Sequence, residues 1–188
     1  DLEEALRSRG LPLVSLENGL PLREFHVVGF SLQYELTFTT VLAMLELGGI
    51  PLRANDRAED APLIIAGGPV SAHPEPLAPF LDLVLVGDAE HGLPGLLLAD
   101  ADLRERGASR ADRVAELARR PGLYAPNLAS TSPDPATGRL VVGALEDVGG
   151  GPVGVHVPVL IAAGDGVAVG QDDVGSAVAL LGRGGDEL

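Results

Sequence analysis

Residues 62–69 read Pro-Leu-Ile-Ile-Ala-Gly-Gly-Pro, a short apolar run that glycine and proline end abruptly. A run of this length, without alternation of polar and apolar residues, is typical of a strand that is buried on both faces. Two other runs share this character: residues 25–31, Phe-His-Val-Val-Gly-Phe-Ser, and residues 83–86, Leu-Val-Leu-Val. The sequence therefore predicts three buried strands whose ends carry small and polar residues.

Segments with helical periodicity separate these strands. Apolar residues recur every three or four positions from Leu36 to Leu47, and Gly48-Gly49 ends this helix. After the third strand we expect helices at about 89–99 and from Ser109, a good N-cap, to Arg120. Strands that alternate with helices predict an α/β fold of the flavodoxin-like or Rossmann-like kind, with a mostly parallel sheet and helices on both faces.

Shorter elements complete the expected domain. They are assigned from capping residues, proline and glycine, and short apolar runs. They comprise an opening helix over residues 1–7 that Asp1 caps and Gly10 ends, an edge strand at 50–53, one or two helical turns at 75–81 and a last strand at 123–125.

The composition changes beyond this domain. Residues 127–138 are rich in Asn, Ser, Thr and Pro, which predicts a linker. Residues 139–188 are rich in Gly, Val and Ala and favour a low-complexity tail, with a strand at 153–162 and no helix except at 173–181. The expected units are an α/β domain over 1–126 and a linker with a disordered tail over 127–188.

Composition also excludes several classes of function. The net charge of -14 repels phosphate backbones, so we expect no nucleic-acid binding from this segment. The absence of cysteine excludes disulfides, thiolate metal sites and an iron–sulfur cluster held by this chain. No apolar run reaches the roughly 18 residues that span a bilayer. We therefore expect a cytoplasmic protein that does not enter the membrane.

The carboxyl ends of the three predicted strands form the candidate site, because ligands of open α/β sheets bind outside these ends. Glycine lacks a side chain, so the backbone at Gly67-Gly68 could approach a planar ligand closely. Asp88 and Glu90 stand where the next helix begins, and either could instead cap that helix. The candidate cofactor-binding residues are Ser31, Leu32, Gln33, Gly67, Gly68, Pro69, Gly87, Asp88 and Glu90.

Other chemical motifs are weak or absent. No phosphate-binding glycine loop appears, and no Ser/His/Asp triad follows from spacing. The histidines His26, His73, His91 and His156 lack the spacing of metal ligands, although His73 follows the second strand closely. We therefore predict neither a metal site nor catalytic residues in this chain.

The three strand ends, taken in order, resemble a known family. Val28–Ser31, Gly67–Pro69 followed by Pro74-Glu75, and Asp82–Glu90 are similar to the cobalamin-binding-type domain of radical S-adenosylmethionine (SAM) proteins. In that family this domain precedes a catalytic barrel with a three-cysteine cluster motif. The resemblance covers about residues 1–126.

Phe30–Thr37 and Pro12–Glu17 are similar to a narrower branch of that family, but other features depart from its pattern. Ala89 stands where family members have glycine between two acids, so this turn is expected to differ. The family's opening strand and helix have no counterpart, which would leave one edge of the sheet uncovered. An Asp-x-His-x-x-Gly motif is also missing, so a bound cobalamin would lack the histidine that this motif supplies.

The resemblance implies an accessory domain that positions cobalamin over the barrel or caps it. The 4Fe-4S cluster and SAM would belong to that barrel, which is the expected partner within the parent protein. Two alternatives remain. One is a structural or interaction domain of the same fold that binds no cofactor. The other is an independent flavodoxin-like module for a nucleotide or flavin, which the missing phosphate loop and the low aromatic content, 3%, disfavour.

Overall fold

The computed structural model describes residues 2–129, 131–133, 140–142, 169–171 and 177–182. Its helices are α1 (Leu2–Arg9), α2 (Phe38–Leu47), α3 (Ala89–Glu105) and α4 (Arg110–Leu117). Its strands are β1 (Phe25–Ser31), β2 (Leu63–Gly67), β3 (Leu83–Leu85), β4 (Leu123–Tyr124), β5 (Thr131–Pro133), β6 (Leu140–Val142), β7 (Val169–Gln171) and β8 (Ala177–Gly182). Single 3-10 turns lie at Leu22–Glu24, Glu35–Thr37, Ala54–Asp56, Pro69–Ala72, Ala78–Phe80 and Pro126–Leu128.

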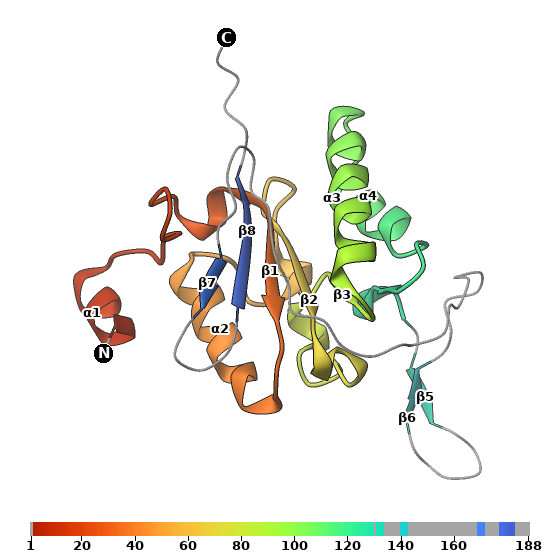
Figure 1. The fold of residues 1–188 in the computed structure, drawn as a ribbon, viewed down its shortest axis with the longest axis horizontal. Coiled ribbons are helices and arrows are strands. Elements are labelled where there is room, and N and C mark those ends of the chain that lie inside the picture. Colours follow the sequence, from red (N-terminus) through yellow and green to blue (C-terminus); the bar gives the residue numbers. More distant parts are fainter. Residues whose placement is uncertain (1, 130, 134–139, 143–168, 172–176, 183–188) are drawn as a thin grey trace.

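The main sheet has the strand order β4-β3-β2-β1-β8-β7 (Figure 1). Its centre is parallel: Val27 of β1 lies opposite Leu63 of β2, and Ile65 of β2 lies opposite Leu83 of β3. β4 and β8 are antiparallel to their neighbours β3 and β1. The predicted mostly parallel α/β sheet is therefore confirmed, with antiparallel strands at its flanks.

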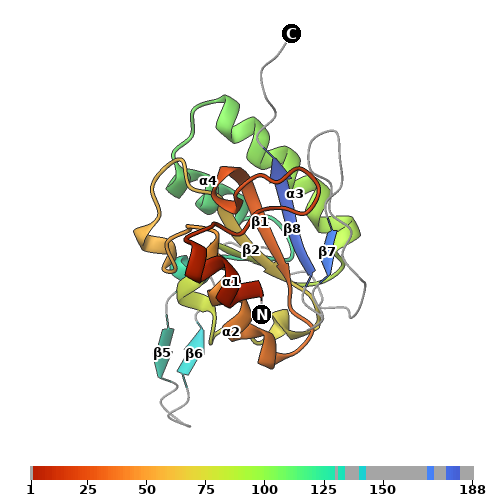
Figure 2. The same cartoon turned by 90° about the vertical axis from the view of Figure 1, so that its left-hand side faces the viewer.

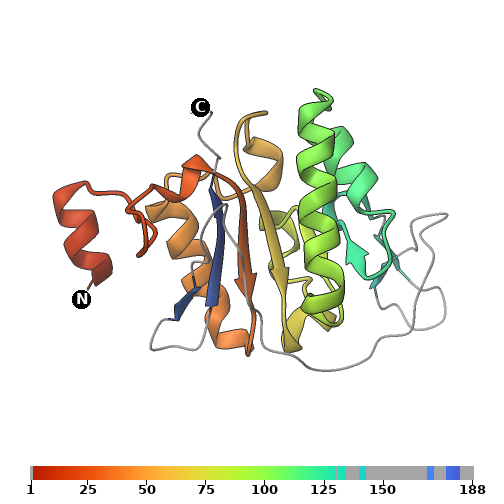
Figure 3. The same cartoon turned by 45° about the horizontal axis from the view of Figure 1, so that its top comes forward.

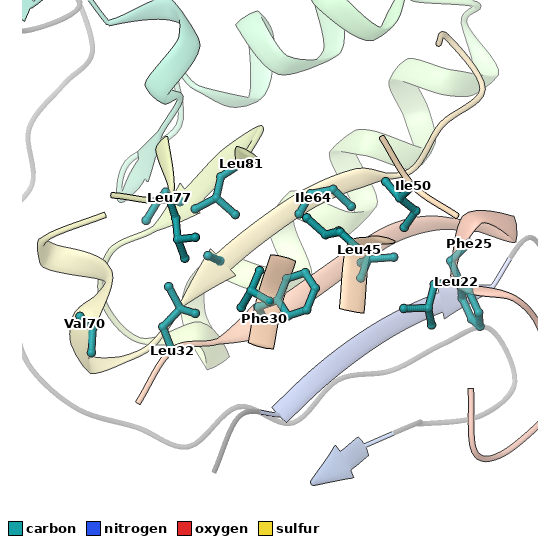
Figure 4. Packing of buried hydrophobic residues seen from close by; sticks show 14 residues of the cluster. Leu22, Phe25, Phe30, Leu32, Leu45, Ile50, Ile64, Val70, Leu77 and Leu81 are labelled. Carbon is teal, nitrogen blue, oxygen red and sulfur yellow. The ribbon is translucent and has the colours of Figure 1, made fainter. Parts of the chain in front are cut away.

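Helices cover both faces of this sheet, as the views in Figures 2 and 3 show. On one face, Val41 and Leu45 of α2 join a buried cluster with Phe30 and Ile64 of the strands (Figure 4). On the other face, α3 and α4 bury Leu96 and other apolar side chains against β2 and β3. Each fully buried leucine contributes about 1.5–3 kcal/mol, so the two layers hold the parallel strands in place.

The helix boundaries follow the expected capping signals with small shifts. The Oγ of Ser109 accepts a hydrogen bond from the Asp112 N–H at 3.1 Å, which confirms Ser109 as the N-cap of α4. α4 ends at Leu117, earlier than expected, while α3 continues to Glu105, beyond the expected end. Gly10 follows α1 with a φ of +62°, as a helix stop requires, and Asp1 lies outside the described residues.

One of the shorter predictions is wrong. Residues 50–53 form no strand, because the carbonyl groups of Pro51 and Leu52 accept hydrogen bonds from the Arg57 guanidinium and not from a neighbouring strand. Residues 75–81 contain one helical turn, the 3-10 turn at Ala78–Phe80, as expected. Several prolines in this loop lack the N–H that a regular helix needs.

The segment beyond residue 126 is partly structured where the structure describes it. Residues 177–182 form strand β8, so the helix considered at 173–181 is wrong over these residues. β8 pairs with β1, on the side of β1 away from β2. The strand expected at 153–162 lies outside the described residues. Of the helices that the structure does describe, none is long and apolar enough to cross a membrane.

A buried ion cluster fastens the amino ends of β2 and β3. The Asp82 Oδ2 accepts hydrogen bonds from Arg57 Nη1 at 2.9 Å, from Arg110 Nη2 at 2.7 Å and from the Ile64 N–H at 2.6 Å. The Asp82 N–H in turn donates to the Ile64 carbonyl at 2.8 Å. Burial raises the pKa of Asp82, and the charges of Arg110 and Arg57 oppose that shift. Because two guanidinium groups bond this carboxylate, we expect it to remain ionised.

Replacing Asp82 by Asn should destabilise the domain strongly, because two buried arginines would lose their counter-charge. Breaking a buried ion pair costs about 3–5 kcal/mol. A suitable control is Asp102→Asn, since Asp102 pairs with Arg106 at the exposed surface, where such pairs contribute less than about 1 kcal/mol. Urea unfolding followed by circular dichroism measures both variants. Equal unfolding midpoints would contradict the structural role of Asp82.

Candidate functional site

The loops that follow β1, β2 and β3 lie along one edge of the sheet, because these strands are adjacent and parallel. Ser31, the last residue of β1, lies opposite Gly67, the last residue of β2. Gly87 and Asp88 follow β3 and lead into α3. The predicted residues are therefore brought to one edge, with the β2 loop in the middle.

The first loop is largely part of the core. Ser31 is only 2% exposed, and its Oγ accepts a hydrogen bond from Gln33 Nε2 at 2.8 Å. Leu32 is fully buried, its N–H donates to the Gly67 carbonyl at 2.7 Å, and its carbonyl accepts from the Val70 N–H at 3.2 Å. Of these residues only Gln33 is exposed, so it alone presents a side chain at the surface.

The Gly-Gly pair of the second loop has two different environments. Gly68 has a φ of +99°, and a Cβ placed there would lie 2.8 Å from the Leu32 carbonyl oxygen. A Cβ at Gly67 would meet its nearest atom, the Leu85 carbonyl oxygen, at an ordinary 3.5 Å. Gly68 is therefore required by the packing of the first loop on the second, whether or not a ligand binds beside it.

The third loop leaves open space at its glycine. Gly87 has a φ of +116°, and a Cβ there would have no atom within 4 Å. Asp88 stands at the N-cap position of α3, yet its side chain makes no capping hydrogen bond. Its Oδ1 atom is buried and has no hydrogen-bond partner among the described residues, and its Oδ2 lies 3.8 Å from His91 Nδ1. The expected capping role of Asp88 is thus not seen, and one carboxylate oxygen is left unsatisfied.

The departure at Ala89 has no visible effect on this turn. The positive φ that the turn needs falls on Gly87, while Ala89 is the first residue of α3 and is buried. Gly92, one turn later, lets the helix approach β3, because a Cβ there would lie 2.7 Å from Leu85 Cδ1. Glu90 is exposed in the first turn of α3, where a negative charge favours the helix dipole.

A planar cofactor that carries amide groups at its rim needs backbone that it can approach closely and acceptors for its N–H groups. Gly87 leaves room for close approach, and the neighbouring Asp88 carboxylate, whose side chain is 39% exposed, is a hydrogen-bond acceptor. The residues present thus fit the rim of such a ligand. In the part of the chain that the structure describes, no group of three or more His, Cys, Asp or Glu side chains could hold a metal ion.

A tyrosine that sequence reasoning missed joins the second loop to the far strand. The Tyr124 hydroxyl of β4 donates a hydrogen bond to Glu75 Oε1 at 3.1 Å, and Glu75 belongs to the Pro-Glu pair of the resemblance. Burial, together with the charge of Glu75 and this hydrogen bond, raises the pKa of Tyr124 to about 12. The sequence offered two weak signals for this contact: Glu75 follows a loop proline, and Tyr124 lies in a predicted strand. Neither signal identifies the partner.

The comparison with protein families settles the relationship. Residues 1–126 match the family described as radical SAM proteins, N-terminal. The chain belongs to this family. No curated protein and no solved structure matches it. The matched region of this radical SAM N-terminal domain includes all the candidate residues, the Asp82 cluster and Tyr124.

A shallow groove of the radical SAM N-terminal domain lies away from this edge. It has a volume of about 430 Å³ and runs between α3 and α4. Two ion pairs line it, Arg106 with Asp102 and Arg119 with Glu116. Asp112 and Arg120 bond instead to the Ser109 hydroxyl and the Gly95 carbonyl, and the groove lies outside the predicted strand-end site.

The Gly68→Ala variant should lose stability, because its side chain would need an unfavourable positive φ and would press on the Leu32 backbone. A non-glycine residue in such a conformation costs about 1–3 kcal/mol. The matched change Gly67→Ala should cost less than about 1 kcal/mol, since its Cβ has room. Thermal and urea unfolding of the two variants test this difference. Equal losses would show that the contact with Leu32 does not constrain Gly68.

The raised pKa of Tyr124 predicts a loss of stability at alkaline pH. An ordinary tyrosine titrates near 10.0 and Tyr124 near 12, so the folded state holds its proton more tightly. The stabilisation is complete below pH 10 and disappears as the pH rises from 10 to 12. The chain has only two tyrosines, so tyrosinate absorbance in Tyr34→Phe reports Tyr124 alone.

In the Tyr34→Phe variant, a further Glu75→Gln change should lower the pH midpoint of the Tyr124 titration, because it removes the negative charge beside the hydroxyl. Titration of the Tyr34→Phe variant in denaturing urea supplies the reference value. A midpoint in the folded protein equal to this reference would contradict the Tyr124–Glu75 contact.

Proposed function

We propose that this radical SAM N-terminal domain is an accessory domain that positions cobalamin at the carboxyl edge of β1, β2 and β3. The observation that carries the proposal is the third loop, where Gly87 faces open space and the partly exposed Asp88 carboxylate has, among the described residues, no hydrogen-bond donor for its Oδ1 atom. An open backbone beside an unsatisfied acceptor suits a ligand that brings both a flat surface and N–H donors. The corrin ring of cobalamin has this combination, since amide groups surround its plane.

Particular residues would hold the ring. The backbone of Gly67 and Gly87 would lie against the corrin, and the Asp88 carboxylate, whose side chain is 39% exposed, would accept a hydrogen bond from one of its amides. Gly68 and Leu32 would act indirectly, by fixing the shape of the second loop. Bound cobalamin would supply a cobalt centre for radical or group-transfer chemistry.

The proposed partner is the catalytic barrel of a radical SAM protein, which would hold the 4Fe-4S cluster and SAM. This chain has no cysteine and therefore cannot hold that cluster itself. Beside the candidate edge, Leu36 is 81% exposed and Tyr34 is 37% exposed. Exposed apolar side chains next to a site are typical of a protein contact surface, so this loop is a candidate contact with the barrel.

The alternative is a domain that keeps the fold and binds no cofactor. It is favoured by the Gly68–Leu32 contact, which explains one of the two central glycines by packing alone. Under this alternative the same edge would only cap the barrel, and the third loop would remain open.

Binding of hydroxocobalamin distinguishes the cobalamin-binding domain from the domain that binds no cofactor. The purified chain is mixed with hydroxocobalamin, freed of excess ligand by gel filtration and examined by its visible spectrum. We expect retained corrin, and we expect Asp88→Ala to weaken binding about 10- to 100-fold, since a hydrogen bond to a charged group is worth about 1.5–3 kcal/mol. Because Asp88 makes no capping bond, this change should cost less than about 1 kcal/mol of stability.

The control is Asp112→Ala, which removes the same charge from the first turn of α4, outside the candidate edge. It should leave corrin binding unchanged. Wild-type chain that retains no corrin would support the domain without cofactor. Retention that Asp88→Ala does not weaken would place the ligand on another loop.

A further inference from the structure

Strand β1 is buried along its length, but the family region gives it one strand neighbour. Six of its seven residues are buried, all but His26. Within the described residues 2–126, β1 forms a ladder with β2 alone. In the part of the chain that the structure describes, the strand partner on the opposite edge of β1 comes from beyond residue 126, where the matched region ends.

An unpaired strand edge of this kind is energetically unfavourable, and it tends to pair with strands of other chains. Each buried backbone group without a partner costs about 1–3 kcal/mol. Natural edge strands are usually protected by lysine, proline or a bulge. The β1 sequence Phe-His-Val-Val-Gly-Phe-Ser has no proline and no Asp, Glu or Arg, and the ladder with β8 shows a register shift only between Phe25 and Val27, so most of β1 suits a strand with neighbours on both sides.

Strand β8 supplies the missing neighbour. It lies antiparallel to β1, with Leu180 opposite Val28, Val178 opposite Phe30 and Ala177 opposite Ser31. Figures 1 and 3 show β8 beside β1, on the side away from β2. β8 comes from residues 177–182, more than fifty residues beyond the end of the family match.

We propose that the outer edge of β1 is a peptide-docking edge that accepts an extended apolar segment in antiparallel register, and that β8 is its occupant within the same chain. Strand addition of this kind draws its affinity from main-chain hydrogen bonds along the exposed edge. The ligand class is an extended apolar peptide such as Ala-Val-Ala-Leu-Leu-Gly, the β8 sequence. This inference does not depend on cobalamin, because it concerns the side of β1 and not the ends of the strands.

The test is made in the full chain by breaking β8 with the double change Ala179→Pro/Leu180→Pro. Consecutive residues of an antiparallel strand direct their N–H groups to opposite sides, so one of the two prolines must remove a donor that faces β1. Hydrogen exchange of the β1 amides around Val28 should then become at least about tenfold faster. The control Ala179→Val/Leu180→Val keeps both donors and should leave this exchange slow.

The broken variant should also bind a fluorescein-labelled peptide of residues 176–183 in a saturable way, and the peptide should restore slow exchange in β1. A peptide that carries the two prolines should not bind. Wild-type chain should bind the peptide at least about tenfold more weakly, because its own β8 occupies the edge. Unchanged exchange in the broken variant, or failure of the wild-type peptide to bind it, would overturn the proposal.

A second measurement remains informative if the proline variant does not fold. The chain has no cysteine, so Val28→Cys/Leu180→Cys introduces a single pair of directly opposed thiols. Opposed residues of antiparallel strands have Cα atoms about 4.5–5.5 Å apart, within the range of a disulfide. We expect a cross-link within one chain on mild oxidation.

The control pair Val28→Cys/Gly170→Cys should not cross-link, because Gly170 lies in β7, which pairs with β8 and not with β1. Absence of the Val28–Leu180 cross-link would overturn the docking of β8 on β1. A cross-link between two chains would overturn its occupancy within the same chain.

Discussion

The carboxylate of Asp82 and the backbone of Ile64 hold each other by two hydrogen bonds at the amino ends of β2 and β3, while Arg57 and Arg110 neutralise the buried charge. These strands are only five and three residues long. At about 3.3 Å per residue, their carboxyl ends lie only about 10–17 Å from this anchor. Fixing the amino ends therefore also fixes the positions of the loops that carry the candidate site.

The sequence predicted the parts of this arrangement that depend on local patterns. Unbroken apolar runs located β1, β2 and β3, and Ser109 located the start of α4. The partners of Asp82 could not be predicted, because its ion pairs with Arg57 and Arg110 span 25 and 28 residues, and nothing in the sequence selects these arginines from the others. The strand expected at 50–53 is absent for the same reason, because the Arg57 guanidinium donates hydrogen bonds to the carbonyl groups of Pro51 and Leu52.

The candidate site was predicted as a set of loops, and the structure distinguishes the roles within that set. Glycine is uninformative by itself, because close packing and ligand approach both require it. The backbone of Leu32 explains Gly68 by packing, whereas open space at Gly87 leaves its glycine without a packing explanation. The unsatisfied Oδ1 of Asp88 lies beside Gly87. The sequence signal for a cofactor site is strongest at the Gly-Gly-Pro loop. The structure gives more support to the loop that begins α3.

The two proposed surfaces share one residue and are compatible. The ladder between β1 and β8 ends at the pair Ser31 and Ala177, so an added strand stops where the candidate site begins. Leu32 turns away from β8 to bond the Gly67 carbonyl, and Gln33 bonds the Ser31 hydroxyl. A peptide on the side of β1 would thus support the base of the first loop without covering the strand ends. Loss of β8 would remove the strand neighbour of Ser31. We therefore expect structural changes at Gln33, which bonds the Ser31 hydroxyl, before any change at Gly87 and Asp88, which follow β3, two strands away.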